Sequence, residues 1–134
     1  MAEQTDDIRT TRGRRSFEDS RPGVRIVENP FDVEIRVGEV LEAEAFPEAR
    51  KPKMAKLWID LGEEGGEIQS AAQLDHHYEP DELEGRQVLC ATTLGTVQVA
   101  GFKSEALTVC VPGEEEYPVL VKPDEEVPLG GLLF

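Results

Sequence analysis

The stretch VEIRVGEVLEAEAF, residues 33–46, decides the fold class. Apolar side chains alternate with Glu34 and Arg36 as far as Val37, which is typical of a strand with one buried face. Apolar residues resume after Gly38, where a strand can bulge or bend. The pattern predicts one long first strand that curls, as strands of a small β-barrel do.

Further segments downstream read as strands, and one reads as a short helix. Pro80 suits a first helical position, acidic residues follow it, and Gly85 suits the stop, so YEPDELEG at 78–85 predicts one or two helical turns. The predicted strands after the first are KLWIDLG at 56–62, GEIQSAA at 66–72, RQVLCATTL at 86–94 and ALTVCV at 106–111. Five strands with a short helix between the third and fourth predict an all-β, five-stranded OB-fold barrel.

Composition divides the chain into a tail and one domain. Residues 1–28 mix six Arg with six acidic residues and show no periodicity, so we expect a mobile, Arg-rich N-terminal tail. Residues 29–134 hold the remaining 8 basic and 22 acidic residues, and therefore all of the net charge of −14. We expect this part to be a single domain.

This acidity has two open interpretations. Adaptation to a high-salt cytoplasm is one, and the shortage of Lys beside Arg fits it; an ordinary acidic protein is the other. Either way, such a surface repels nucleic acid at low salt, because phosphate binding depends on clustered Lys and Arg.

Several classes of function are disfavoured. No apolar run approaches the roughly 20 residues that cross a bilayer, and no secretory signal opens the chain, so we expect no membrane partner and a cytoplasmic location. Cys90 and Cys110 lie in apolar strand-like runs and read as buried thiols in a reducing compartment. His76 and His77 are adjacent, and no metal-ligand spacing includes them. We expect no metal, no cofactor and no catalytic residue, and hence no enzyme.

Three segments together carry a resemblance to a known family. They are FDVEIRVGEVLEAEAFPEARKPKMAKLWIDLG at 31–62, QSAAQLDHHYEPDELEGRQV at 69–88 and VAGFKSEALTV at 99–109. In order and spacing they resemble the tRNA-binding domain family, and most closely its CsaA branch of export-related chaperones. The resemblance implies an OB-fold in residues 29–134, a homodimer built partly from the terminal segments, and tRNA as partner. For the CsaA branch it implies, as an alternative, a chaperone that binds unfolded or pre-export polypeptides.

The resemblance also suggests a ligand surface at residues 101–105, beside the SAAQ segment. Lys103 is predicted to meet a phosphate, Ser104 a sugar or base edge, and Glu105 a base donor or a neighbouring cation. The other interpretation of Ser104 and Glu105 is that they hydrogen-bond the turn that starts the fifth strand. Ser70 and Gln73, in QSAAQ, join the predicted ligand contacts.

Positive charge and aromatic rings complete the candidate site. The first long loop supplies the concentrated cations of the folded part, and a merely solvated charged loop is the alternative. Aromatic side chains provide stacking for bases, at about 1–3 kcal/mol each, or else belong to the core. The candidates for phosphate contact are Arg36, Arg50, Lys51, Lys53 and Lys56, and those for stacking are Phe102 and Trp58.

The C-terminal extension, residues 118–134, is rich in apolar residues after the five barrel strands are complete. Prolines at 118, 123 and 128 confine it to edge or extended pairing. Its apolar residues need a surface, which predicts a dimerisation segment with two-fold symmetry. The alternative is that the segment folds back on its own barrel.

Overall fold

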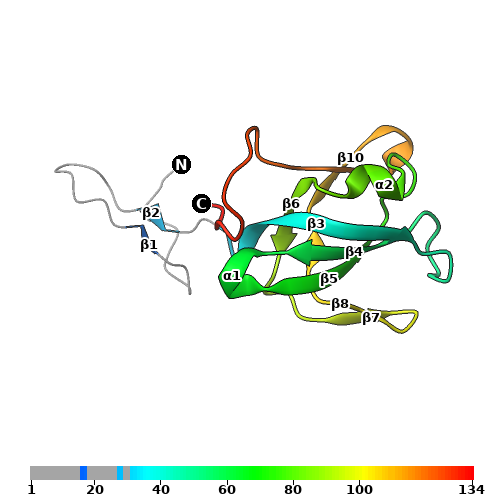
Figure 1. Ribbon diagram of the computed structural model, residues 1–134, viewed down its shortest axis with the longest axis horizontal. Coiled ribbons are helices and arrows are strands. Elements are labelled where there is room, and N and C mark those ends of the chain that lie inside the picture. The colour runs from blue at the N-terminus through cyan, green and yellow to red at the C-terminus, as the bar shows by residue number, and fades with distance from the viewer. Residues whose placement is uncertain (1–15, 18–26, 29–30) are drawn as a thin grey trace.

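The computed structural model describes residues 16–17, 27–28 and 31–134. A nearly closed antiparallel sheet of five strands forms its body (Figure 1). In sheet order, the strands are β5 (Glu67–Ala72), β4 (Ala55–Asp60), β3 (Ile35–Ala45), β6 (Gln87–Ala91) and β9 (Leu107–Thr108). The short helix α2 (Pro80–Leu83) lies between the third and fourth of these along the chain. The predicted all-β OB-fold barrel is confirmed.

The remaining elements are short. They are β1 (Ser16–Phe17), β2 (Val27–Glu28), α1 (Gly62–Gly65), β7 (Val97–Val99), β8 (Phe102–Ser104), β10 (Cys110–Pro112), the 3₁₀ helix η1 (Glu114–Glu116) and β11 (Pro118–Leu120). The sequence did not indicate α1. The predicted fifth strand, 106–111, is divided: β9 pairs with β6, whereas β10 leaves the barrel to pair with β11.

Little of residues 1–28 belongs to the described part of the chain. Within it, β1 and β2 form an antiparallel pair, with Phe17 opposite Val27. The predicted mobility of this tail otherwise concerns residues outside the described ranges, and it stays a prediction.

Strand β3 bends because it serves two neighbours in turn. Its first half pairs with β6 and its second half with β4, and the register with β4 shifts between Val40 and Glu42. The bulge thus lies at Leu41, and Gly38 has a different role. A Cβ atom at Gly38 would lie 2.5 Å from Cγ2 of Ile59, a residue that is fully buried. The absent side chain therefore allows β3 and β4 to cross closely.

The barrel core consists mainly of aliphatic side chains from the inner faces of β3, β4 and β6, from α2 and from the segments that connect the strands. Leu57, Ile59 and Val88 have no exposed surface. Cys90 is buried with them, and desolvation raises its pKa to about 12, while the half-buried Cys110 has its pKa raised to about 11 by the same cause. Both thiols therefore stay protonated at neutral pH, as inert apolar groups.

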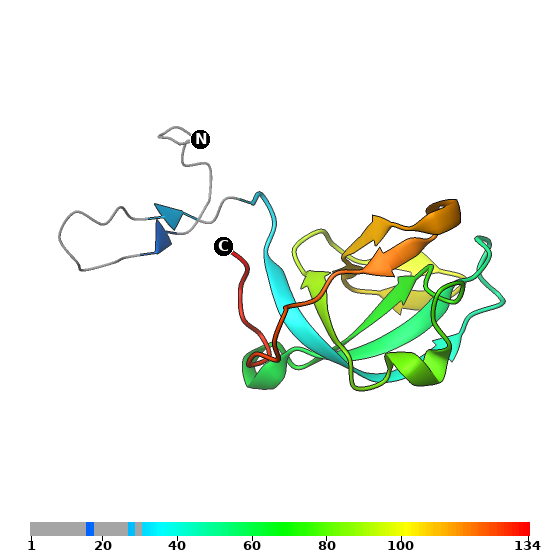
Figure 2. The same ribbon diagram turned by 90° about the horizontal axis from the view of Figure 1, so that it is seen from above.

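The C-terminal segment folds back on its own barrel (Figure 2). The Val37 amide donates to the Gly131 carbonyl at 2.9 Å, and the Gly130 amide donates to the Val37 carbonyl at 2.8 Å. The Leu133 amide likewise donates to the Ile35 carbonyl. The structure therefore shows the C-terminal segment packed on its own barrel, which was the alternative to a dimerisation segment, and the homodimer stays a prediction.

Among the described helices, none has the length and apolar character to cross a membrane.

Replacing Gly38 with Ala is expected to lower the free energy of unfolding by about 1–3 kcal/mol, because the new methyl group overpacks the contact with Ile59. Urea denaturation measures the change. Gly131→Ala is the matched control, since its Cβ would meet nothing nearer than 3.7 Å and the change should stay within about 1 kcal/mol. Equal stability of Gly38→Ala and the wild type would show that the close crossing does not constrain β3.

Candidate nucleic-acid interface

The polar triplet at 103–105 closes the barrel between β5 and β9. The Ala71 amide donates to Ser104 Oγ at 3.0 Å, and the Gln69 amide donates to Glu105 Oε1 at 2.9 Å. In the opposite direction, the Glu105 amide donates to the Gln69 carbonyl at 2.8 Å. Two side chains therefore replace a neighbouring strand along the edge of β5. Ser104 and Glu105 thus accept structural hydrogen bonds, as the second interpretation of these residues expected, but the donors lie on β5 and not in the turn before β9.

Ser70 lies inside the barrel at the same seam. Its side chain has no exposed surface, its hydroxyl donates to the Ala106 carbonyl at 2.9 Å, and it shares a 2.8 Å hydrogen bond with the Thr108 hydroxyl. A buried hydroxyl with both partners inside the protein supports the seam. Ser70, predicted as a ligand contact, is therefore left out of the candidate surface.

The loop between β3 and β4 is anchored to the segment that follows β5. Gln73 Nε2 donates to the Pro52 carbonyl at 2.9 Å, and the Asp75 amide donates to the Lys53 carbonyl at 2.9 Å. Lys53 itself has a left-handed backbone, with φ of 63°. The predicted contact Gln73 thus has a second task, since it fixes the loop that carries the cations.

An aromatic cluster, defined as Phe46, Trp58 and Phe102, lies apart from the barrel core; Phe46 is buried in it, and Trp58 and Phe102 are half-buried. The ring centroid of Phe102 is 5.6 Å from that of Phe46 and 5.7 Å from that of Trp58, both edge to face. Lys56 Nζ lies 4.8 Å from the Phe46 centroid and 5.4 Å from the Phe102 centroid, in cation–π geometry. Lys56 and Trp58 alternate with the buried residues of β4, which places both on its outer face.

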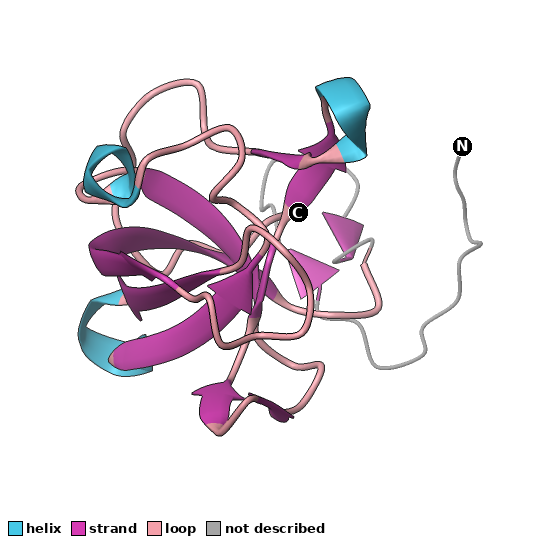
Figure 3. Ribbon diagram, turned by 90° about the vertical axis from the view of Figure 1, so that its right-hand side faces the viewer, coloured by secondary structure: helices cyan, strands magenta, loops and turns pink. Residues whose placement is uncertain are grey.

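The basic end is defined as Arg50, Lys51, Lys53, Lys56 and Lys103, which belong to the loop and strands that carry this cluster. The first three are exposed in the β3–β4 loop, and Lys103 is exposed on β8. The loop and the β7–β8 hairpin pack together, because Phe102 and Val99 contact the buried Phe46 and its neighbours. Figure 3 faces the side of the molecule toward which this loop and the hairpin turn project. Five of the eight basic residues of 29–134 thus gather at one end.

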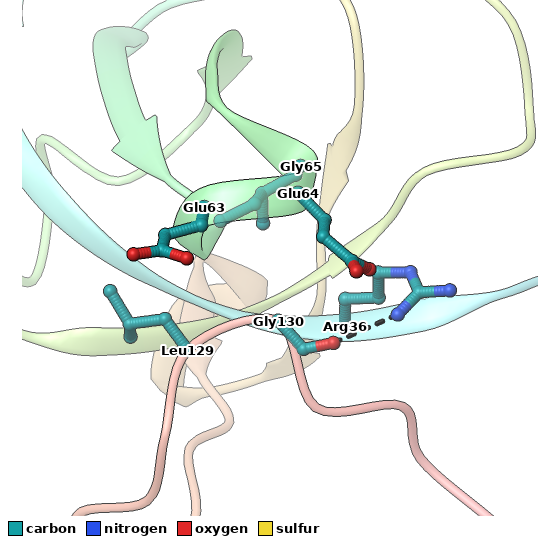
Figure 4. Close-up of a pocket in the computed structure, with 7 residues that line it drawn as sticks. Arg36, Glu63, Glu64, Gly65, Leu129 and Gly130 are labelled. Atoms are coloured by element: carbon teal, nitrogen blue, oxygen red, sulfur yellow. Dashed lines mark hydrogen bonds between the residues drawn. The ribbon is translucent and has the colours of Figure 1, made fainter.

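Arg36 is not part of the basic end. Its guanidinium donates to the Gly130 carbonyl at 2.8 Å and to Glu34 Oε1 at 2.9 Å. It lines an open groove of about 540 Å³ between α1 and the C-terminal segment, together with Glu63 and Glu64 (Figure 4). Arg36 lies eight positions before Glu44 on β3, a span of roughly 25 Å, and Glu44 is the residue opposite Lys56. The prediction that Arg36 joins the loop cations is therefore not supported by its position.

A family comparison fits this geometry. The family model described as "Putative tRNA binding domain" matches residues 35–131. The chain belongs to the tRNA-binding domain family. The resemblance read from the sequence is thereby confirmed, and Phe102, Lys103 and the β3–β4 loop lie within the matched range.

Relatives of two kinds share this tRNA-binding domain. Chaperone CsaA of Bacillus anthracis is 36% identical, with a TM-score of 0.69, and the match covers 76% of this chain and 91% of that one. CsaA of Picrophilus torridus is 32% identical with the same TM-score, over 77% and 92% of the two chains. Methionine–tRNA ligase of Methanothrix thermoacetophila is 36% identical over 105 residues, which are 75% of this chain. The chain spans only 15% of that ligase, so the likeness concerns one part of it.

One contributor to the candidate site of this tRNA-binding domain escapes the sequence pattern. Phe46 ends the alternating run of β3, so it reads as an ordinary core residue, yet its ring contacts both Phe102 and Lys56.

The histidines form a separate group: His76 Nε2 lies 3.1 Å from Glu115 Oε1, and the His76 ring stacks on Tyr117. Across the described ranges, no three His, Cys, Asp or Glu side chains are arranged to hold a metal ion.

Glu105→Ala is expected to lower the free energy of unfolding of the tRNA-binding domain by about 1–3 kcal/mol, because the Gln69 amide loses its acceptor at the seam. Glu105→Gln is the matched control. Its amide oxygen can still accept this bond, so the loss should stay below about 1 kcal/mol. Urea denaturation compares the three proteins, and an unchanged stability of Glu105→Ala would show that the side chain does not hold the seam.

Proposed function

We propose that the chain is a cytoplasmic tRNA-binding protein that acts as a homodimer and contacts tRNA through the basic end and the aromatic cluster. The observation that carries the proposal is that five cations belong to the same loop and strands as three clustered aromatic rings, with Lys56 over two of the rings, on a domain of the tRNA-binding family. Cations meet phosphates, and exposed ring faces stack with unpaired bases, which is the usual division of labour in RNA recognition.

The charge of the whole chain sets a condition on this function. A net charge of −14 repels a polyanion over long distances, but salt at 0.15 M screens exposed charges beyond about 8 Å. Direct contacts between the basic end and phosphates are shorter than this screening length, so salt weakens them less than it weakens the repulsion from the rest of the surface. We therefore expect the repulsion to oppose binding most strongly at low ionic strength. This behaviour suits either interpretation of the acidic composition.

Lys103→Gln is expected to weaken binding of total tRNA and to reduce the slope of log affinity against log salt by about 1, because one phosphate contact is lost. Lys122→Gln makes the same charge change on an exposed residue away from the basic end and should leave the slope unchanged. Filter binding over a series of KCl concentrations measures both, with an expected ratio of one tRNA to two chains. The absence of tRNA binding at every salt concentration would refute the proposal.

A second candidate function is that of a chaperone for unfolded or pre-export polypeptides. It is favoured by the two relatives named chaperone CsaA and by the half-buried Phe102, an apolar side chain at the ligand face that needs no charged partner.

If polypeptides are the ligand, Phe102→Ala is expected to protect a denatured client less well, so that the client aggregates more than it does with the wild type. Light scattering follows this. Leu107→Ala, which truncates an apolar residue that is 56% exposed, is the control and should protect as the wild type does. Undiminished protection by Phe102→Ala would exclude the aromatic cluster as the polypeptide site.

A further inference from the structure

Carboxylates border the aromatic cluster on its β3 side. In the register of β3 and β4, Glu42 is directly opposite Trp58, and Glu44 is opposite Lys56. Both glutamates are exposed, and within the described part of the chain neither forms an ion pair. Directly opposite residues on one face of a sheet are close enough for their side chains to share a ligand.

Lys56 does not neutralise these acids, although it faces one of them. Its ammonium group lies over the rings of Phe46 and Phe102 instead. The carboxylates therefore remain available as acceptors next to the basic end. Beside a phosphate-binding surface, a free carboxylate opposes binding unless the ligand donates hydrogen bonds to it.

The β5 side of Trp58 also offers an acceptor. Gln69 is opposite Trp58 in the register of β4 and β5, and its Nε2 donates to the Lys103 carbonyl at 2.9 Å. That bond occupies the amide nitrogen and leaves Oε1 without a hydrogen bond from the described residues. Trp58 thus lies between a carboxylate and an amide oxygen, which suits a flat ligand with donors on its edge.

We propose, on the basis of the proposed tRNA binding, that this face selects an unpaired guanine. The base stacks on Trp58, its N1–H and its exocyclic N2 amine both donate to the Glu42 carboxylate, and its phosphate lies toward Lys56 and Lys103. Among the four standard bases, guanine alone presents two adjacent donors on its pairing edge, and a carboxylate is an acceptor-only group with two oxygens. Glu42 is therefore a specificity-determining residue.

The single tryptophan of the chain, Trp58, reports directly on this face. Quenching of its fluorescence gives the affinity of the full chain for the RNA trinucleotides UGU, UIU, UAU and UUU, where I is inosine, which lacks the N2 amine. We expect UGU to bind about tenfold more tightly than UUU, with UIU between them, because a bidentate pair is worth about 1–3 kcal/mol of discrimination. Glu42→Gln should reduce the ratio of UGU to UUU affinity to within about twofold.

The control separates base reading from general electrostatics. Removal of any negative charge strengthens RNA binding, so the ratio of affinities, and not their absolute value, is the readout. Glu84→Gln makes the same charge change at the end of α2 and should keep the full preference for UGU.

The outcomes distinguish this inference from the proposed function. Equal affinity of the wild type for all four trinucleotides, or an unchanged preference in Glu42→Gln, overturns guanine selection. If total tRNA still binds in the filter assay, the proposed function stands. If no RNA binds and an arginine-containing peptide quenches Trp58 in a Glu42-dependent way, both are overturned in favour of a polypeptide ligand.

Discussion

The barrel depends on a seam that backbone pairing alone does not close. Strands β5 and β9 are the two edges of the sheet, and β9 is only two residues long. Glu105 Oε1 and Ser104 Oγ accept the free amides of β5, and the buried hydroxyls of Ser70 and Thr108 bond across the interior. Edge strands with unpaired amides invite association with other chains, so these side chains also protect the edge.

The same seam positions the candidate interface. Ser104 and Glu105 directly follow Phe102 and Lys103, so the bonds that close the barrel also hold the backbone of these two residues beside β5. Phe102 then reaches Trp58 on β4. The surface proposed to bind RNA is therefore rigid because it is built on the closure of the core, and a change at the seam affects stability and recognition together.

Part of the site was within reach of sequence reasoning. Lys103 and the loop cations could be singled out, because they are the concentrated positive charges of an acidic domain and lie in segments that resemble a known family. Arg36 belongs to the same chemical class, and no local pattern distinguishes it. The C-terminal segment packs beside Arg36, and the Gly130 carbonyl, more than ninety residues away in the chain, accepts a hydrogen bond from the Arg36 guanidinium. Ser70 was predicted as a ligand contact from the resemblance of its segment to the family, and only the pairing of β5 places its hydroxyl inside the barrel, bonded to the Ala106 carbonyl.

The sequence by itself determined the strand succession, the short helix after Pro80, the family and the acidic character, because these depend on periodicity, turn residues and composition over short windows. Only the tertiary structure decided where the fifth strand breaks, which face of β4 carries Trp58, and whether residues 118–134 serve their own barrel. Pairing between segments far apart in the chain settles these points, and a period-2 pattern is the same whichever neighbour a strand acquires. The opposition of Glu42 and Trp58 is a matter of register alone, set by the bulge at Leu41 that follows the Val40–Ile59 pair.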